Sequence, residues 1–281
     1  MRAVRELLEA RGFRFSKSMG QNFLIDSNIP EKIVRLAALD ASCGVLEVGP
    51  GLGALTSALS KAAGRVLAVE LDGRLVPILR EKFAEQSNVE IIQGDILKLA
   101  LRRLVGEKMP GLPCHICANL PYNITTPALT AFIGSGVFKS ITVMVQREVA
   151  RRICAKPASP EYGAFSVFVS YHSEPELLFD VPPECFLPRP KVFSSVVKLK
   201  MRSSSFLEAE AEELFFKAVR AAFGQRRKTL VNALYAVFGN ALDKETIEGA
   251  VARCGFDTRI RGETLGLEDF MKISASIGLF L

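Results

Sequence analysis

Apolar runs that stop at polar residues recur along the first half of the chain. The pattern predicts a buried strand at Val45–Val48, and Ala54–Lys61 has the spacing of the helix that follows it. Three further apolar runs end at Glu70, Asp95 and Asn119, each about one strand–helix unit after the last. We therefore expect these polar side chains to line the carboxyl edge of a parallel sheet, where open α/β sheets bind ligands.

The turn after the first strand carries a glycine at every second position, in Glu47-Val-Gly-Pro-Gly-Leu-Gly53. This spacing is one residue tighter than the pattern typical of nicotinamide and flavin binders, which argues against a dehydrogenase. Glycines leave backbone N–H groups open to close approach by a ligand. Taken alone, the loop could also be an ordinary glycine-rich turn between a strand and a helix.

The carboxylates that end the next two strands suit a nucleoside cofactor. Glu70 can accept hydrogen bonds from both ribose hydroxyls and would repel a 2′-phosphate. Asp95 is placed to accept from an adenine amino group. Each residue alone could equally be a solvated strand end or a helix cap.

The tetrapeptide Asn119-Leu-Pro-Tyr122 suits an amino group on a flat ring. An aryl amine is a poor nucleophile because its lone pair is delocalised into the ring. The Asn119 side-chain oxygen and the Leu120 carbonyl can each accept one N–H, while Pro121 adds no competing donor and fixes the turn. Tyr122 offers a stacking face. Without the glycine loop, a plain turn with a core tyrosine would explain these residues as well; with it, they suggest methyl transfer from S-adenosylmethionine to the exocyclic nitrogen of a base.

Six motifs spread over nearly the whole chain strengthen this interpretation. They are Gly20–Leu24, Glu47–Gly53, Asn119–Tyr122, Gln146–Arg151, Phe186–Val192 and Phe223–Thr229. Together they resemble the ribosomal RNA adenine dimethyltransferases, and in particular the bacterial small-subunit branch. The resemblance implies that the methyl donor contacts the positions Asn22, Leu24, Gly49, Glu70, Asp95 and Asn119. The shape of the glycine loop adds Gly51 and Gly53 to the expected contacts. It also implies that Phe186 sandwiches the target adenine against Tyr122.

The same resemblance implies a substrate. It would be N6 of two adjacent adenosines near the 3′ end of small-subunit (16S) ribosomal RNA, within an immature 30S particle, methylated by a monomeric enzyme. Two alternatives stay open at this point. One is the large-subunit (23S) RNA dimethylase that confers macrolide resistance, and the other is a mainly non-catalytic RNA-binding assembly factor.

The distribution of charge agrees with a polyanionic partner. The net charge is +6 and the pI about 9.0. Residues 1–202 carry 26 Lys/Arg against 19 Asp/Glu, whereas residues 203–281 carry 10 against 11. An excess of this sign suits nucleic acid, although many basic proteins bind none.

Positive charge gathers in the N-terminal arm and in the stretch from Leu214 to Asn240, which contains no acidic residue. If one helix continues through Gly224, four of its cations share an arc of about 100° opposite an apolar face. Either segment could instead be a solvated surface. The RNA contacts that we expect are Arg14, Lys17, Arg147, Lys217, Arg220, Arg226, Arg227 and Lys228.

The remaining patterns complete the expected organisation. We expect a Rossmann-like, doubly wound α/β methyltransferase domain at residues 1–202 and a small all-helical, RNA-binding domain at 203–281, with the break at the serines after Arg202. The run Cys114-His-Ile-Cys117 resembles half of a zinc site, but no second Cys/His pair completes it, so no metal is expected. The six cysteines, the lack of an apolar signal segment and the lack of a membrane-spanning run indicate a reducing cytoplasm.

Overall fold

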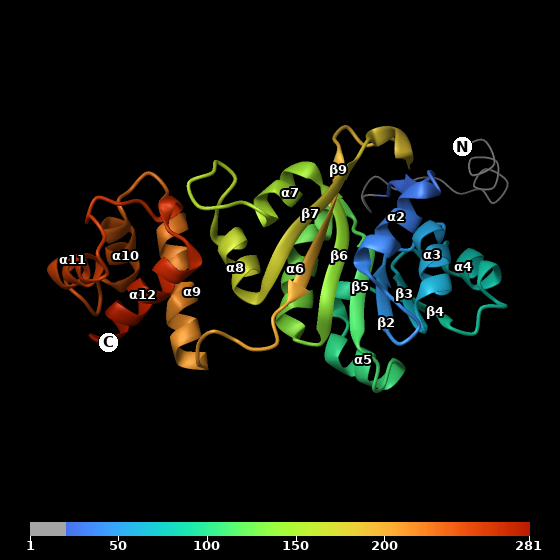
Figure 1. Cartoon of the computed structure of the whole chain (residues 1–281), viewed down its shortest axis with the longest axis horizontal. Helices are drawn as coiled ribbons and strands as arrows, with labels where there is room; N and C mark the ends of the chain where they lie inside the picture. The colour runs from blue at the N-terminus through green and yellow to red at the C-terminus, as the bar shows by residue number, and fades with distance from the viewer. Residues whose placement is uncertain (1–20) are drawn as a thin grey trace. The chain divides into compact units, whose positions relative to one another are not determined.

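A computed structural model describes residues 21–281, and the contacts within it divide them into two compact units (Figure 1). The first unit is an α/β unit of residues 21–150 and 175–201, and the second is a helical unit of residues 151–174 and 202–281. The chain therefore passes between the units three times, whereas a single passage near Arg202 was expected. Residues 151–174 join the helical unit because Tyr162, Val167 and Tyr171 are buried in its core.

The α/β unit is built on a mainly parallel sheet of seven strands in the order β4-β3-β2-β5-β6-β9-β7. Strands β2 to β6 run parallel and β9 pairs antiparallel with β6. The strands are β2 (Gly44–Val48), β3 (Arg65–Glu70), β4 (Val89–Gln93), β5 (Cys114–Asn119), β6 (Phe138–Gln146), β7 (Ser173–Val181) and β9 (Ser194–Met201). This confirms the Rossmann-like α/β fold with C-terminal helices.

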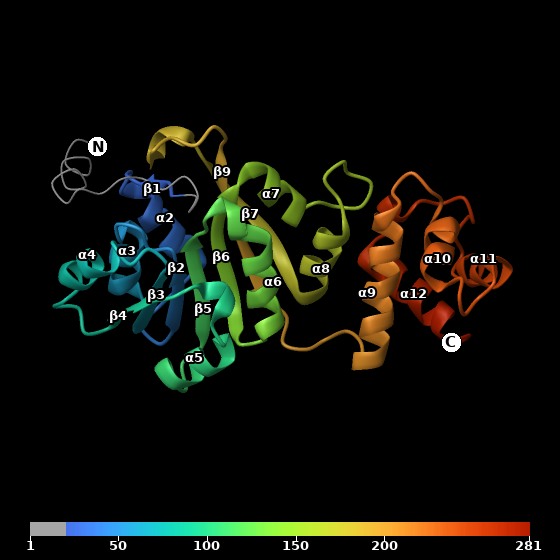
Figure 2. The same cartoon turned by 180° about the vertical axis from the view of Figure 1, so that it is seen from behind.

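The central strands are mainly apolar because both faces of the sheet are covered. All five residues of β2 are buried. On one face α2 (Asn28–Ala37) and α3 (Ala54–Ala62) pack against β2 and β3, and α6 (Thr125–Ser135) lies on the other face (Figure 2). The remaining helices of this unit are α4 (Val76–Lys82), α5 (Leu101–Lys108) and the start of α7 (Arg147–Ile153), with the 3₁₀ turns η1 (Ile96–Lys98), η2 (Tyr122–Ile124) and η3 (Pro183–Cys185).

A separate two-stranded sheet joins two segments that are far apart in the sequence. Strand β1 (Phe23–Leu24) pairs antiparallel with β8 (Phe186–Leu187), and Leu24 lies opposite Phe186. The pairing brings Phe23 and Leu24 of the first motif beside Phe186 and Leu187 of a later one.

The helical unit buries a core of large aromatic side chains, including Tyr171, Phe215, Phe238 and Phe270. Its helices are α8 (Ala164–His172), α9 (Ala209–Gly224), α10 (Leu230–Phe238), α11 (Lys244–Arg253) and α12 (Leu267–Gly278), with the turn η4 (Gly262–Thr264). Among residues 21–281, no helix is long and apolar enough to cross a membrane.

The single helix considered for Leu214 to Asn240 does not form, because the first helix stops at Gly224. Helix α9 ends at Gly224 and α10 begins at Leu230, with Thr229 capping α10 by accepting the Asn232 N–H at 3.4 Å. Glycine is a poor helix residue and threonine a good cap, which accounts for the break. Lys217 and Arg220 therefore lie on α9, while Arg226, Arg227 and Lys228 lie on a turn, Gln225–Thr229, which we call the cationic turn.

Candidate active site

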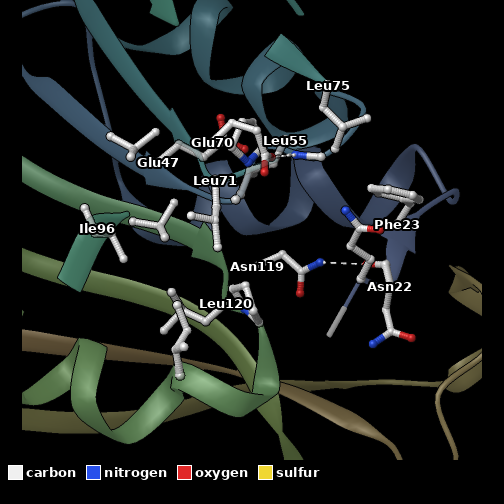
Figure 3. Close-up of a pocket in the computed structure, with 18 of the residues that line it drawn as sticks. Asn22, Phe23, Glu47, Leu55, Glu70, Leu71, Leu75, Ile96, Asn119 and Leu120 are labelled. Atoms are coloured by element: carbon white, nitrogen blue, oxygen red, sulfur yellow. Dashed lines mark hydrogen bonds between the residues drawn. The ribbon is translucent and has the colours of Figure 1, made fainter. Parts of the chain in front are cut away.

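A cavity of about 220 Å³ opens at the carboxyl edge of the sheet in the α/β unit (Figure 3). Its walls come from the Gln21–Leu24 segment, the glycine loop and the residues that follow β3, β4 and β5. The structure thus brings together Asn22, Leu24, Gly49, Gly51, Glu70, Asp95 and Asn119 through Tyr122. We call Glu70, Asp95 and Asn119 the donor edge, because the methyl donor is expected to bind there.

The three loop glycines adopt left-handed backbone conformations, with φ of 65°, 59° and 75° at Gly49, Gly51 and Gly53. A Cβ at Gly51 would lie 2.8 Å from the Phe23 ring, and one at Gly53 would lie 2.6 Å from the Phe83 ring. Packing within the protein therefore requires glycine at the last two positions. At Gly49 a Cβ would have room, since its nearest neighbours are 3.6 Å away, and only the backbone conformation favours glycine there.

Glu70 is held by backbone donors at the end of β3. One carboxylate oxygen accepts the Gly51 N–H at 3.1 Å and the other accepts the Asp72 N–H at 2.9 Å. Burial raises the pKa of Glu70, and the two N–H bonds oppose this by favouring the ionised form. Each oxygen keeps further acceptor capacity, so the carboxylate can still take hydroxyl donors from a ligand.

A third carboxyl beside the cavity, that of Glu47, was not among the expected donor contacts. Glu47 is 1% exposed, and its Oε2 has no hydrogen-bond partner in the part of the chain that the structure describes. Burial raises its pKa to about 8. The ammonium of Lys82 lies above the glycine loop and donates to the Leu52 and Gly53 carbonyls at 2.9 and 3.3 Å. An acidic residue before a glycine loop was the available sequence signal, but only the fold shows that one of its carboxyl oxygens, Oε2, is buried without a partner among the described residues.

Asp95 acts as a helix cap and lines the cavity at the same time. It follows β4 and accepts the Leu97 N–H at 3.1 Å, which caps η1. Lys98 lies 3.8 Å away on the same turn. The bond to Leu97 fixes the direction of the carboxylate. Asp95 can therefore be a helix cap and also line the cavity as a hydrogen-bond acceptor.

The Asn119 amide is oriented by the neighbouring Asn22. Its Nδ2 donates to the Asn22 backbone carbonyl at 3.2 Å, which leaves the side-chain oxygen as the acceptor (Figure 3). The following Leu120 is 1% exposed and its N–H donates to the Met144 carbonyl at 3.1 Å. These bonds fix the start of the tetrapeptide against β6.

Tyr122 is fixed by its hydroxyl group. The phenol oxygen lies 2.6 Å from the Oγ of Ser194, the fully buried first residue of β9. Burial raises the pKa of Tyr122. Ser194 was not among the expected site residues, because only the antiparallel pairing of β9 with β6 places it here.

Phe186 lies in a different environment from the one that the resemblance implied. Its side chain is 1% exposed and packs in the core of the α/β unit with Leu24, Ile33 and Val196. It does not line the cavity, whereas Tyr122 does. In this arrangement the Phe186 ring presents no open face to a base.

The expected RNA-contacting residues are found in several settings. Arg220, Arg227 and Lys228 are exposed, and Lys217 lies with its ammonium 4.8 Å from the Phe238 ring centre. Arg226 donates to the Tyr162 carbonyl and, at 3.5 Å, to the Pro160 carbonyl, so it ties the cationic turn to the 155–163 loop. Arg147 is at the end of β6 in the α/β unit. Arg14 and Lys17 lie outside the described residues.

The suspected half of a zinc site has a structural explanation. His115 Nδ1 lies 2.8 Å from the Ser140 Oγ on the neighbouring strand. Across residues 21–281, no group of three His, Cys, Asp or Glu side chains is placed to hold a metal ion.

Comparison with known proteins gives this geometry a family. Residues 12–255 match the family described as ribosomal RNA adenine dimethylase. The chain belongs to this family. A relative from Alkaliphilus oremlandii, named ribosomal RNA small subunit methyltransferase A, is 45% identical and aligns over 95% of this chain and 93% of its own length. A relative of the same name from Shouchella clausii is 44% identical over 96% and 92%.

Two solved structures have the same fold. A dimethyladenosine transferase from Plasmodium falciparum superposes with a TM-score of 0.80 at 25% identity, covering 92% of this chain and all of that one. The 23S ribosomal RNA methyltransferase ErmE superposes with a TM-score of 0.72 at 26% identity over the same shares.

Proposed function

We propose that the protein transfers methyl groups from S-adenosylmethionine to N6 of two adjacent adenosines near the 3′ end of small-subunit ribosomal RNA. The observation that carries the proposal is the donor edge beside a fixed Asn119–Tyr122 tetrapeptide, in a chain 45% identical to a small-subunit methyltransferase. The large-subunit relative is 26% identical, so the small-subunit RNA is favoured. We further propose that the enzyme acts as a cytoplasmic monomer on an immature 30S particle.

The donor set of the cavity fits S-adenosylmethionine. The Glu70 carboxylate has acceptor capacity for ribose hydroxyls, and Asp95 can accept from the adenine amino group. Glu47 supplies an unpaired, buried oxygen that can accept from an ammonium group. When bound, this cofactor supplies a methyl group activated by a positive sulfur.

The tetrapeptide can make the target amine more nucleophilic. The Asn119 side-chain oxygen and the Leu120 carbonyl each accept one N–H, which favours a pyramidal nitrogen with a localised lone pair. Because Asn22 fixes the Asn119 amide, this oxygen needs little reorganisation during the reaction. Tyr122 holds the base by stacking, at about 1 to 3 kcal/mol per stacked base.

RNA binding would draw on both units. Arg147, Lys217, Arg220, Arg227 and Lys228 supply cations for phosphates. Arg226 would act by holding the cationic turn against the 155–163 loop.

The test is transfer of a labelled methyl group to protein-free 16S RNA, to immature 30S particles and to 23S RNA, with the products identified by mass spectrometry. We expect dimethyladenosine at two adjacent positions of the small-subunit RNA. Dimethylation confined to 23S RNA would favour the large-subunit alternative. RNA binding without any methyl transfer would favour an assembly factor and contradict the proposal.

A further inference from the structure

The loop before β9 carries an aromatic side chain with no role in the site described so far. Phe193 is 39% exposed and its neighbour Val192 is 44% exposed. Phe186, the aromatic residue of the preceding motif, is buried in the core. The open ring on this loop is therefore that of Phe193.

Phe193 is held in place by Arg147. The Arg147 backbone N–H donates to the Phe193 carbonyl at 2.9 Å, and the guanidinium carbon lies 4.7 Å from the centre of the Phe193 ring. The nearest carboxylate, Asp180, is 3.9 Å from this guanidinium and also accepts the Ser195 hydroxyl at 2.5 Å. The ring and the cation thus lie against each other, and we call them the Phe193–Arg147 pair.

The pair lies at the same edge of the sheet as the tetrapeptide. Phe193 directly precedes Ser194, whose hydroxyl bonds to Tyr122 at 2.6 Å. Arg147 directly follows β6, the strand that pairs with the Asn119 strand β5 on one side and with β9 on the other. Strands β6 and β9 therefore bring the pair to the strand ends beside the one that carries Asn119.

The chemistry of the pair matches a single-stranded nucleotide. Bases stack on exposed aromatic rings, and an arginine beside the ring can neutralise the phosphate. The loop also carries Arg189 and Lys191, both cationic, which adds positive charge around the ring. Covering the exposed part of a phenylalanine ring with a base removes apolar surface from water, which is favourable.

We propose that the Phe193–Arg147 pair is a subsite for a nucleotide that flanks the target adenosine, with its base stacked on Phe193 and its phosphate bound by Arg147. This inference rests on the proposed function, because it takes Tyr122 to hold the target adenine. Tyr122 would then hold the methylated base while the pair fixes the adjoining nucleotide.

The experiment uses the full chain and short single-stranded RNAs that carry 2-aminopurine at each position next to the target adenosine. Stacking on Phe193 quenches the fluorescence of one flanking position, and Phe193→Ala restores it. Phe193→Trp keeps the quenching, because the larger ring still stacks. Phe193→Ala also weakens RNA affinity about ten-fold, within the range for one stacked base. Arg147→Ala lowers the salt dependence by about 0.7 in the slope of log affinity against log salt.

The helical unit offers a matched control. Phe206 is 46% exposed and lies 5.0 Å from the Arg202 guanidinium, so Phe206→Ala removes an equivalent ring from another surface. This variant should leave the quenching and the affinity unchanged. Circular dichroism and calorimetric binding of S-adenosylmethionine confirm that each variant is folded.

Unchanged quenching and RNA affinity in folded Phe193→Ala would overturn the proposal. So would a loss seen only with assembled particles and not with protein-free RNA, because that result assigns the ring to a protein contact. If the wild-type protein methylates its RNA in either case, the proposed function survives and only the subsite fails. If it methylates no RNA, the proposed function fails, and the fluorescence still reports on the subsite.

Discussion

The donor edge of the α/β unit and the cationic turn of the helical unit hold their polar side chains in different ways. At the donor edge, Glu70 and Asn119 are fixed by hydrogen bonds to backbone groups. On the cationic turn, Arg227 and Lys228 are exposed, and their charges face solvent. Preorganised groups act through geometry, whereas solvated charges act through counterion release. Substitutions in the two regions should therefore be separable by rate and by salt dependence.

The largest effect is expected at Asn119. Asn119→Ala removes one acceptor for the target amine and should slow single-turnover methyl transfer about 10²-fold or more at saturating S-adenosylmethionine, with little change in RNA affinity. After the first methylation the amine keeps one N–H, so the two steps should respond differently. Wild-type rates for both steps, resolved by mass spectrometry, would exclude the proposed role of this oxygen.

Glu70 should affect donor binding and leave RNA binding unchanged. Glu70→Ala removes a charge-assisted acceptor and should weaken S-adenosylmethionine binding by about 1.5 to 3 kcal/mol. Glu70→Gln, which keeps the shape of the side chain, should show a smaller effect. Calorimetry that found unchanged donor affinity in the folded alanine variant would remove Glu70 from the site.

Glu47 should make the stability of the ligand-free protein depend on pH. Its folded pKa of about 8 lies above its ordinary value of 4.5, so the native state binds the extra proton between these values. Its contribution is complete below about pH 4.5 and is lost as the pH rises to 8, with a slope of up to about 1.4 kcal/mol per pH unit. Urea unfolding of Glu47→Gln should flatten this decline, and an unaltered profile would contradict the shift.

The cationic surface should give a smaller and salt-dependent effect. Reversing Arg220 and Arg227 to Glu should weaken RNA binding and lower the slope of log affinity against log salt by about 0.7 to 0.9 for each phosphate that the variant no longer binds. Donor binding should not change. Lys272→Glu on α12 is the control. Equal salt slopes in the wild type, the Arg220/Arg227 variant and the Lys272 variant would mean that α9 and the cationic turn are only solvated surfaces.

The smallest effect is expected at the Tyr122 hydroxyl. Tyr122→Phe and Ser194→Ala each remove the same hydrogen bond, worth about 1 kcal/mol, and should raise the KM for RNA a few-fold while the rate at saturation changes less. The double variant should be no worse than either single variant, because the two residues act through one hydrogen bond. Additive effects would show that Ser194 acts independently of Tyr122.

Features of the fold and the site that follow from local sequence patterns could be predicted, whereas features that depend on long-range strand pairing could not. The apolar runs before Glu70, Asp95 and Asn119 follow local patterns, and the structure confirms a strand at each, although β4 ends at Gln93, two residues before Asp95. The burial of Phe186 and the Tyr122–Ser194 bond depend on the pairing of β1 with β8 and of β6 with β9, between segments far apart in the sequence. Such pairings leave no local pattern in the sequence. The motif at Phe186 therefore predicted a stacking residue, whereas the structure buries its ring in the core.

Arg226 shows the same limit in the helical unit. As one of three consecutive cations it could not be told apart from Arg227 by sequence. Its bonds to the Tyr162 and Pro160 carbonyls depend on residues 151–174 joining this unit, which no composition shift marks.

The three passages of the chain between the units have a consequence for genetic dissection. A fragment of residues 203–281 would lack Tyr162, Val167 and Tyr171, which complete its aromatic core. Removing buried side chains of this size leaves cavities that cost several kcal/mol each. Residues 203–281 alone should therefore not fold as an independent domain. During synthesis the core of the helical unit cannot be completed until α12 has left the ribosome. The helical unit is completed last, after the strands of the donor edge have been made.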